Sequence, residues 1–228
     1  MLKLMLIGTA HVLDLSLPLE RHIKNFEPEL VALELDKQRW YALKTKTQGT
    51  DGPFYLRILA RLQKYLGDSF GSSPGSEMMV ATRVANSIGA KLAFIDKPIL
   101  QTITRAWRTM PWNEFSAMIR DSMISFVGGG NVSIEKSIRT GDFSSELKEF
   151  SLHYPSLKNE LIDKRDTYMS TRIVRLFRSQ KCEKIVAVVG EGHIDGMAEK
   201  LKSLNPIIVR LSDLLQNNEN SISFSIEI

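Results

Sequence analysis

Cysteine is nearly absent from this chain, which has only Cys182 among its 228 residues. One cysteine cannot form a disulfide within the chain, and it excludes a zinc site built from several cysteines. The chain also lacks any apolar run long enough to span a membrane, and its first strand-like segment is too short and too weakly flanked for a signal peptide. We therefore expect no transmembrane segment and a cytoplasmic location.

The chain has little excess charge of either sign. The formal net charge is +4 at pH 7 and the pI is about 9.1, which favours acidic ligands slightly and does not predict a partnership with nucleic acid. The hydrophobic fraction of 43% and the charged fraction of 25% are typical of a globular protein. With this length, they predict one domain over residues 1–228.

Short apolar segments rich in β-branched residues alternate with longer segments of helical periodicity. The expected strands are Leu2–Ile7, Leu30–Leu35, Leu92–Ile95, Ile185–Val189 and Ile207–Leu211. The expected helices are Leu17–Phe26, Arg57–Leu66, Ser76–Ile88 with Gly89 as its cap, Leu161–Phe177 and Met197–Leu204. This alternation predicts an α/β fold with a mainly parallel central sheet flanked by helices.

The strand pattern is interrupted at about residues 99–154, where large apolar residues recur at helical spacing. We expect a helical insertion that packs on the sheet, with a lid or a dimer surface as the alternative. The helix Leu161–Phe177 carries several arginines, which are expected to lie on a solvated face, with a role at a membrane surface as the alternative. Near the end of the chain, Ser221–Ile228 alternates polar and apolar residues, as in an edge strand or a homodimer contact.

Two Gly-x-x-His tetrads follow apolar strands near opposite ends of the sequence. The first is Gly8-Thr9-Ala10-His11 and the second is Gly190-Glu191-Gly192-His193. In a parallel sheet each tetrad places an imidazole at the carboxyl edge, where ligands bind in open α/β folds. Imidazoles that meet at one site commonly hold a metal ion.

Carboxylates follow two further strands at the same expected edge. Glu34 lies near the end of the second strand, and Asp96 ends the third. Two histidines and a carboxylate suit Zn, Mn, Co or ferrous iron, and such an ion makes water more acidic. Structural alternatives are that Glu34 faces solvent, that Asp96 caps the next turn, and that each histidine only satisfies hydrogen bonds. The two remaining histidines, His22 and His153, are expected to be structural.

Several blocks of the sequence, taken together and in order, resemble the TraB/PrgY family. They are Gly8-Thr9-Ala10-His11, Val31–Asp36 with Arg39, Pro74–Met78, Gly89-Ala90 to Ile95–Ile99, Thr102 through Arg105–Trp107, Lys164–Asp166 with Tyr168 and Met169, and Val188–His193. This family takes its name from the shutdown of bacterial peptide pheromones, and it is similar to the Tiki metalloproteases and the erythromycin-esterase-like superfamily. The chain departs from the family where Asp96-Lys97 replaces Asp-Arg and Lys164-Arg165-Asp166 replaces Glu-Arg-Asp. It also lacks the membrane-spanning helices that follow this domain in many members.

The resemblance implies a metal-dependent hydrolase that is peptidase-like and acts on a peptide or small-molecule substrate. Its implied metal ligands are His11, His193 and Glu34, and Glu77 is a further acidic candidate. The glutamate that does not bind the divalent ion (Mn, Co, Zn or Fe) would accept a proton from water.

The arginines have two interpretations that the sequence leaves open. Arg105 or Arg165 could stabilise the developing negative charge or bind a substrate carboxylate, as could Arg39. Each could equally form a buried ion pair with a nearby carboxylate. The alternative function is accordingly a non-catalytic protein that sequesters a peptide or a small carboxylate ligand. A scaffold that acts within a homo-oligomer is a third possibility.

Overall fold

The computed structural model describes residues 2–10, 15–45, 76–118, 120 and 144–216. Four predicted features therefore lie wholly or partly outside the described residues. They are His11, the helix Arg57–Leu66, part of the helical insertion and the terminal strand Ser221–Ile228.

The centre of the fold is a five-stranded sheet in which every pairing is parallel, as predicted. The strands are β1 (Lys3–Thr9), β2 (Leu30–Leu33), β3 (Lys91–Phe94), β4 (Lys184–Gly190) and β5 (Ile207–Val209). Their spatial order is β3-β2-β4-β1-β5. Strand β4 therefore lies between β1 and β2. Its last residue, Gly190 of the second tetrad, pairs with Thr9 of the first.

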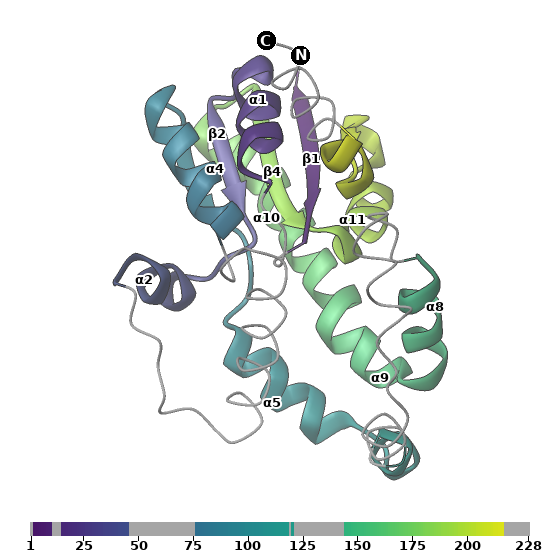
Figure 1. Cartoon of the computed structure of the whole chain (residues 1–228). Coiled ribbons are helices and arrows are strands. Elements are labelled where there is room, and N and C mark those ends of the chain that lie inside the picture. The colour runs from purple at the N-terminus through teal and green to yellow at the C-terminus, as the bar shows by residue number, and fades with distance from the viewer. Residues whose placement is uncertain (1, 11–14, 46–75, 119, 121–143, 217–228) are drawn as a thin grey trace.

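Helices cover both faces of this sheet, which confirms the α/β class (Figure 1). The helices are α1 (Ser16–Phe26), α2 (Lys37–Thr45), α4 (Ser76–Ser87), α5 (Ile99–Thr109), α8 (Ser144–His153), α9 (Pro155–Lys158), a π-helical turn η1 (Asn159–Asp163), α10 (Lys164–Gln180), α11 (Ile194–Lys200) and two short 3₁₀ turns, η2 (Glu191–His193) and η3 (Lys202–Leu204). Two unlabelled helical segments cover 112–118 and 211–216. The end of α4 agrees with the sequence, since Gly89 has a φ of 71° there.

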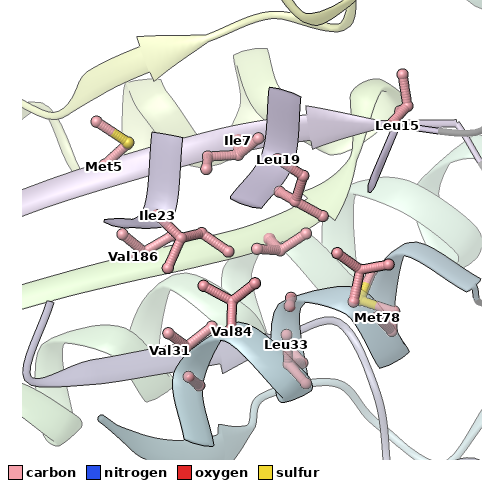
Figure 2. Close-up of a cluster of buried hydrophobic side chains, with 14 of the residues drawn as sticks. Met5, Ile7, Leu15, Leu19, Ile23, Val31, Leu33, Met78, Val84 and Val186 are labelled. Carbon is pink, nitrogen blue, oxygen red and sulfur yellow. The ribbon is translucent and has the colours of Figure 1, made fainter. Parts of the chain in front are cut away.

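Alternate residues of each strand supply two separate apolar layers. On one face, Ile7, Leu33 and Val186 pack against α1 and α4, whose contributions include Ile23 and Met78 (Figure 2). On the other face, neighbouring strand residues pack against α10 and α11. In the three inner strands, β1, β2 and β4, side chains on both faces are buried, so these strands are continuous apolar runs, as expected for a parallel sheet between helices.

The helical character predicted for residues 99–154 is confirmed where the structure describes that segment. Helices α5 and α8 and the helical residues 112–118 are there, and no strand occurs among its described residues. In Figure 1, α5, α8 and α9 lie beyond the carboxyl ends of the strands. Within the described ranges, no helix is both long enough and apolar enough to cross a bilayer.

Candidate functional site

Buried ionisable side chains gather where β2, β3 and β4 end. Glu34 directly follows β2, and it is only 4% exposed, so the alternative that it faces solvent is wrong. Its backbone extends the sheet ladder through a hydrogen bond from its amide to Val188 O (3.0 Å). Its carboxylate Oε2 accepts a hydrogen bond from the Gly190 amide (2.6 Å). The glutamate is thus held across the carboxyl end of the central strand.

Arg165 joins the carboxylates of two neighbouring strand ends. Its Nε and Nη2 donate to the two oxygens of Asp96 at 3.0 and 2.8 Å, and Nη2 also donates to Glu34 Oε1. Nη1 donates to Leu161 O at 3.1 Å. This forked geometry suits a guanidinium and not an ammonium.

The buried position of Arg165 resolves two sequence expectations. The side chain is 10% exposed, so the prediction that its helix carries it on a solvated face is wrong. Burial alone would lower its pKa, but Glu34 and Asp96 raise the pKa above its ordinary value. Of the alternatives for Arg165, the structure shows the buried ion pair.

His193 lies against the same glutamate and is fixed from its far side. Its Nε2 is 3.3 Å from Glu34 Oε1, and its Nδ1 is 2.6 Å from Asp166 Oδ1. Asp166 is 1% exposed and belongs to the first turn of α10. A carboxylate on Nδ1 directs Nε2 toward Glu34, which is how metal-binding or acid–base histidines are commonly oriented.

The charge state of His193 follows from these neighbours. Burial would lower the pKa of His193, but Glu34 and Asp166 outweigh it and raise the pKa to about 9. Without another cation at the site, the imidazole is therefore protonated at neutral pH. A proton on Nε2 occupies the position that a metal ion would need.

One glycine makes room for this arrangement. A Cβ on Gly196 would overlap Asp166 Oδ2 and lie 2.9 Å from its Cγ. At Gly190 a Cβ would make only an ordinary contact, 3.4 Å from Glu34 Oε2. The missing side chain at Gly196 therefore lets α11 approach the Asp166 carboxylate closely.

A second polar network closes the neighbouring strand ends. Glu191 accepts hydrogen bonds from Arg210 Nη1 (3.0 Å) and from the Leu211 amide (2.9 Å), and Arg210 also pairs with Asp195. Burial raises the pKa of Glu191. A Cβ on Gly8 would lie 3.0 Å from Glu191 Cδ, so the first tetrad's glycine admits the second tetrad's glutamate. The network joins the segments that follow β4 and β5 beside the candidate site.

The other predicted residues are distributed around the buried group. Glu77 is buried in the first turn of α4, where it accepts a hydrogen bond from Ser76 Oγ (3.4 Å). Arg105 is exposed on α5, so the structure does not bring it into the buried group. Arg39 is partly exposed and reaches the edge of the buried group, where its Nη1 is 3.7 Å from Asp96 Oδ2. Asp96 Oδ1 also accepts from the amide of the next residue, Lys97 (2.7 Å), but α5 begins only at Ile99 and has no side-chain cap.

The donor set partly fits a divalent ion. Two ligands of a tetrahedral ion, each bound at about 2.1 Å, lie roughly 3.4 Å apart, close to the observed separation of His193 Nε2 and Glu34 Oε1. Within the described ranges, no three His, Cys, Asp or Glu side chains form a metal-binding group. The third predicted ligand, His11, lies outside those ranges and two residues after Thr9.

The chain is similar to an uncharacterised protein of the archaeon Methanocaldococcus jannaschii. The two are 32% identical over 216 residues, which cover 87% of this chain and 53% of the relative. The chain thus spans about half the length of that curated relative. No family model matches.

Two features of the site were not predicted from the sequence. In the sequence, Asp166 belongs only to the Lys164–Asp166 block of the family resemblance, and its contact with His193 depends on how α10 packs against α11. The π-helical turn η1 ends two residues before Arg165, and such turns are frequent at functional sites. The only signal for the Asp166 contact in the sequence is the small residue Gly196, three positions after His193.

Proposed function

We propose that this protein is a metal-dependent hydrolase, peptidase-like in its chemistry, with its site at the carboxyl edge of the sheet. The observation that carries the proposal is the close approach of His193 Nε2 to Glu34 Oε1, with Asp166 orienting the ring from behind. The TraB/PrgY resemblance supports the same residues from the sequence. Since the archaeal relative is uncharacterised, it adds no activity of its own to this support.

His193 and Glu34 would hold the ion together with His11, the third ligand that the resemblance implies. A divalent ion at this position supplies Lewis acidity toward a carbonyl group and toward water. With an ion bound, Asp166 would keep the remaining proton of His193 on Nδ1 and leave the lone pair of Nε2 for the ion. Arg165 would hold the Glu34 carboxylate in place through their ion pair. Glu77 remains the proposed second acid that accepts a proton from water.

One observation favours a second candidate, a non-catalytic binding protein. Three carboxylates, those of Glu34, Asp96 and Asp166, face three cations, which are Arg165, Arg39 and the protonated ring of His193. The group is therefore charge-balanced without a metal ion, as a structural ion-pair network would be. In that case the protein would sequester a peptide or a small carboxylate ligand instead of cleaving it.

Hydrolysis of a peptide library, with Mn, Co, Zn or ferrous iron added in turn, tests the proposal. Wild type should cleave with at least one of these ions, and His11→Ala and His193→Ala should lose the activity. His153→Ala is the matched control, because His153 is exposed at the end of α8 and should keep full activity. Peptide binding without cleavage under every metal condition would favour the binding protein.

A further inference from the structure

Two cations near the end of β3 have no acidic partner among the residues that the structure describes. Lys97 follows Asp96 in the β3–α5 connection, and Arg105 lies along α5. Among the described residues, neither side chain has a carboxylate within ion-pair distance. Their charges are nevertheless close enough to interact, because burial and then the charge of Arg105 lower the pKa of Lys97.

Lys97 is held in place despite the missing ion pair. Its side chain is half-buried, and its ammonium lies 5.3 Å from the centroid of the Tyr168 ring. Tyr168 belongs to α10, three residues after Arg165. Arg172 approaches the same ring and donates to Phe94 O (3.1 Å). The ammonium of Lys97 therefore lies against α10, the helix that carries Arg165.

The nearby acids already have other cations as partners. Glu160, whose charge reaches Lys97, pairs with Lys164 one turn along the helix. Asp96 is engaged by both Arg165 and Arg39. These local ion pairs leave Lys97 and Arg105 without a carboxylate of their own among the described residues, so both cations are available to bind an anion.

We propose that Lys97 and Arg105 form a subsite that binds a carboxylate of the substrate. This inference rests on the proposed hydrolase function and narrows its substrate class to acidic peptides. The carboxylate could be the free C-terminus or an Asp or Glu side chain, since both present the same planar acceptor. An arginine and a lysine together supply the forked and the single donors that a carboxylate accepts.

Equilibrium binding of fluorescent peptides tests the subsite without relying on turnover. The probes are a short peptide pool with free C-termini, the same pool as C-terminal amides, and amide pools with and without an internal Asp or Glu. Binding is measured by anisotropy with 1,10-phenanthroline present, a chelator that is uncharged and blocks cleavage. Wild type should bind the acidic pools roughly tenfold more tightly than the matched neutral pool, because a charged hydrogen bond is lost in the latter. The acidic pool that binds more tightly than its matched neutral pool identifies whether the C-terminal or the side-chain carboxylate is recognised.

Lys97→Met keeps the long side chain against Tyr168 and removes the charge, and Arg105→Gln does the same on α5. Each variant should reduce the preference for acidic peptides about tenfold. Arg108→Gln is the matched control, since Arg108 is an exposed cation of the same helix and its loss should leave the preference unchanged. Thermal unfolding of each variant reports that it is folded, and Lys97→Arg, which keeps the charge, should retain most of the preference.

The results separate the two proposals. Equal binding of acidic and neutral pools by wild type overturns the subsite, even if peptides are cleaved when metal is added. A preference for acidic peptides that depends on Lys97 and Arg105, without cleavage under any metal condition, supports the subsite and contradicts the hydrolase. Tighter binding of a phosphorylated amide peptide than of the free acid overturns the carboxylate assignment.

Discussion

The state of His193 is set by two carboxylates on opposite sides of its ring. Glu34 approaches Nε2 and Asp166 approaches Nδ1, and both favour the protonated ring more than burial disfavours it. The same two contacts would serve a metal site, in which the ion replaces the proton on Nε2. At the scale of single residues, metal and proton therefore compete for one nitrogen.

This competition predicts how the stability of the metal-free protein depends on pH. The pKa of His193 is about 9 in the folded state and near 6.5 in an unfolded chain. Folding therefore strengthens proton binding, and the contribution to stability is fully present below about pH 6.5 and is lost as the pH rises through about 9. The shift corresponds to a contribution on the order of 3 kcal/mol. Urea unfolding of chelator-treated protein between about pH 6 and pH 10 should show this loss.

His193→Gln provides the comparison for that measurement. The variant cannot titrate, so its stability should fall less than that of wild type over the same pH range. An NMR titration of the His193 ring gives the pKa directly. A ring that titrates near its ordinary value would contradict the geometry described here.

Arg165 gives a second prediction at the same scale. Arg165→Met removes the cation and leaves Glu34 and Asp96 buried beside each other, so unfolding should become easier by about 3–5 kcal/mol. Arg178→Met, on the same helix, removes an exposed arginine and should change stability by less than about 0.5 kcal/mol. Equal losses in urea denaturation would show that the buried ion pairs do not stabilise the fold.

Among the elements, α10 and α11 determine whether Asp166 reaches His193. α10 carries Asp166 in its first turn, and α11 begins directly after His193. Gly196 allows these helices to approach, since a Cβ there would overlap the Asp166 carboxylate. The histidine–aspartate contact is therefore a product of helix packing.

Gly196→Ala should push Asp166 away from its present position. We expect a loss of about 1–3 kcal/mol in stability from overpacking, although alanine is the better helix former. Gly192→Ala is the matched control, because a Cβ there would meet nothing within 4 Å and should cost little. Thermal unfolding compares the stabilities of the two variants. A Gly196→Ala protein as stable as wild type would show that α10 and α11 can move apart without loss of stability.

The elements also show where sequence reasoning succeeds and where it ends. All five strands were predicted to within two residues at each end, because parallel strands buried on both faces are continuous apolar runs bounded by polar residues or glycine. The placing of Glu34, Asp96 and His193 at one edge followed from the strand ends alone. The sequence could not decide between the two interpretations of Arg165, because its partners depend on the rotation of α10 over the sheet. The π-helical turn η1 also has no signal in apolar periodicity.

For the whole molecule, strand order decides whether the two tetrads can share one ion. β4 inserts between β1 and β2, and Thr9 of the first tetrad pairs with Gly190 of the second. Residues about 180 positions apart in the chain are therefore neighbours at the carboxyl edge. A metal ion held by both halves would bind the folded chain and not the unfolded one.

Such an ion should raise the melting temperature of the whole protein. At a free concentration of about 100 times the dissociation constant, binding adds about 2.7 kcal/mol, which for a chain of this size is a shift of roughly 5–10 °C. The shift should be absent in both His11→Ala and His193→Ala and present in His153→Ala, as measured by calorimetry with each ion in turn. Because metal binding must displace the proton of His193, the shift should also grow as the pH rises toward 9. If His193→Ala kept the shift while His11→Ala lost it, the ion would bind elsewhere, and the close contact of His193 with Glu34 would be a structural ion pair.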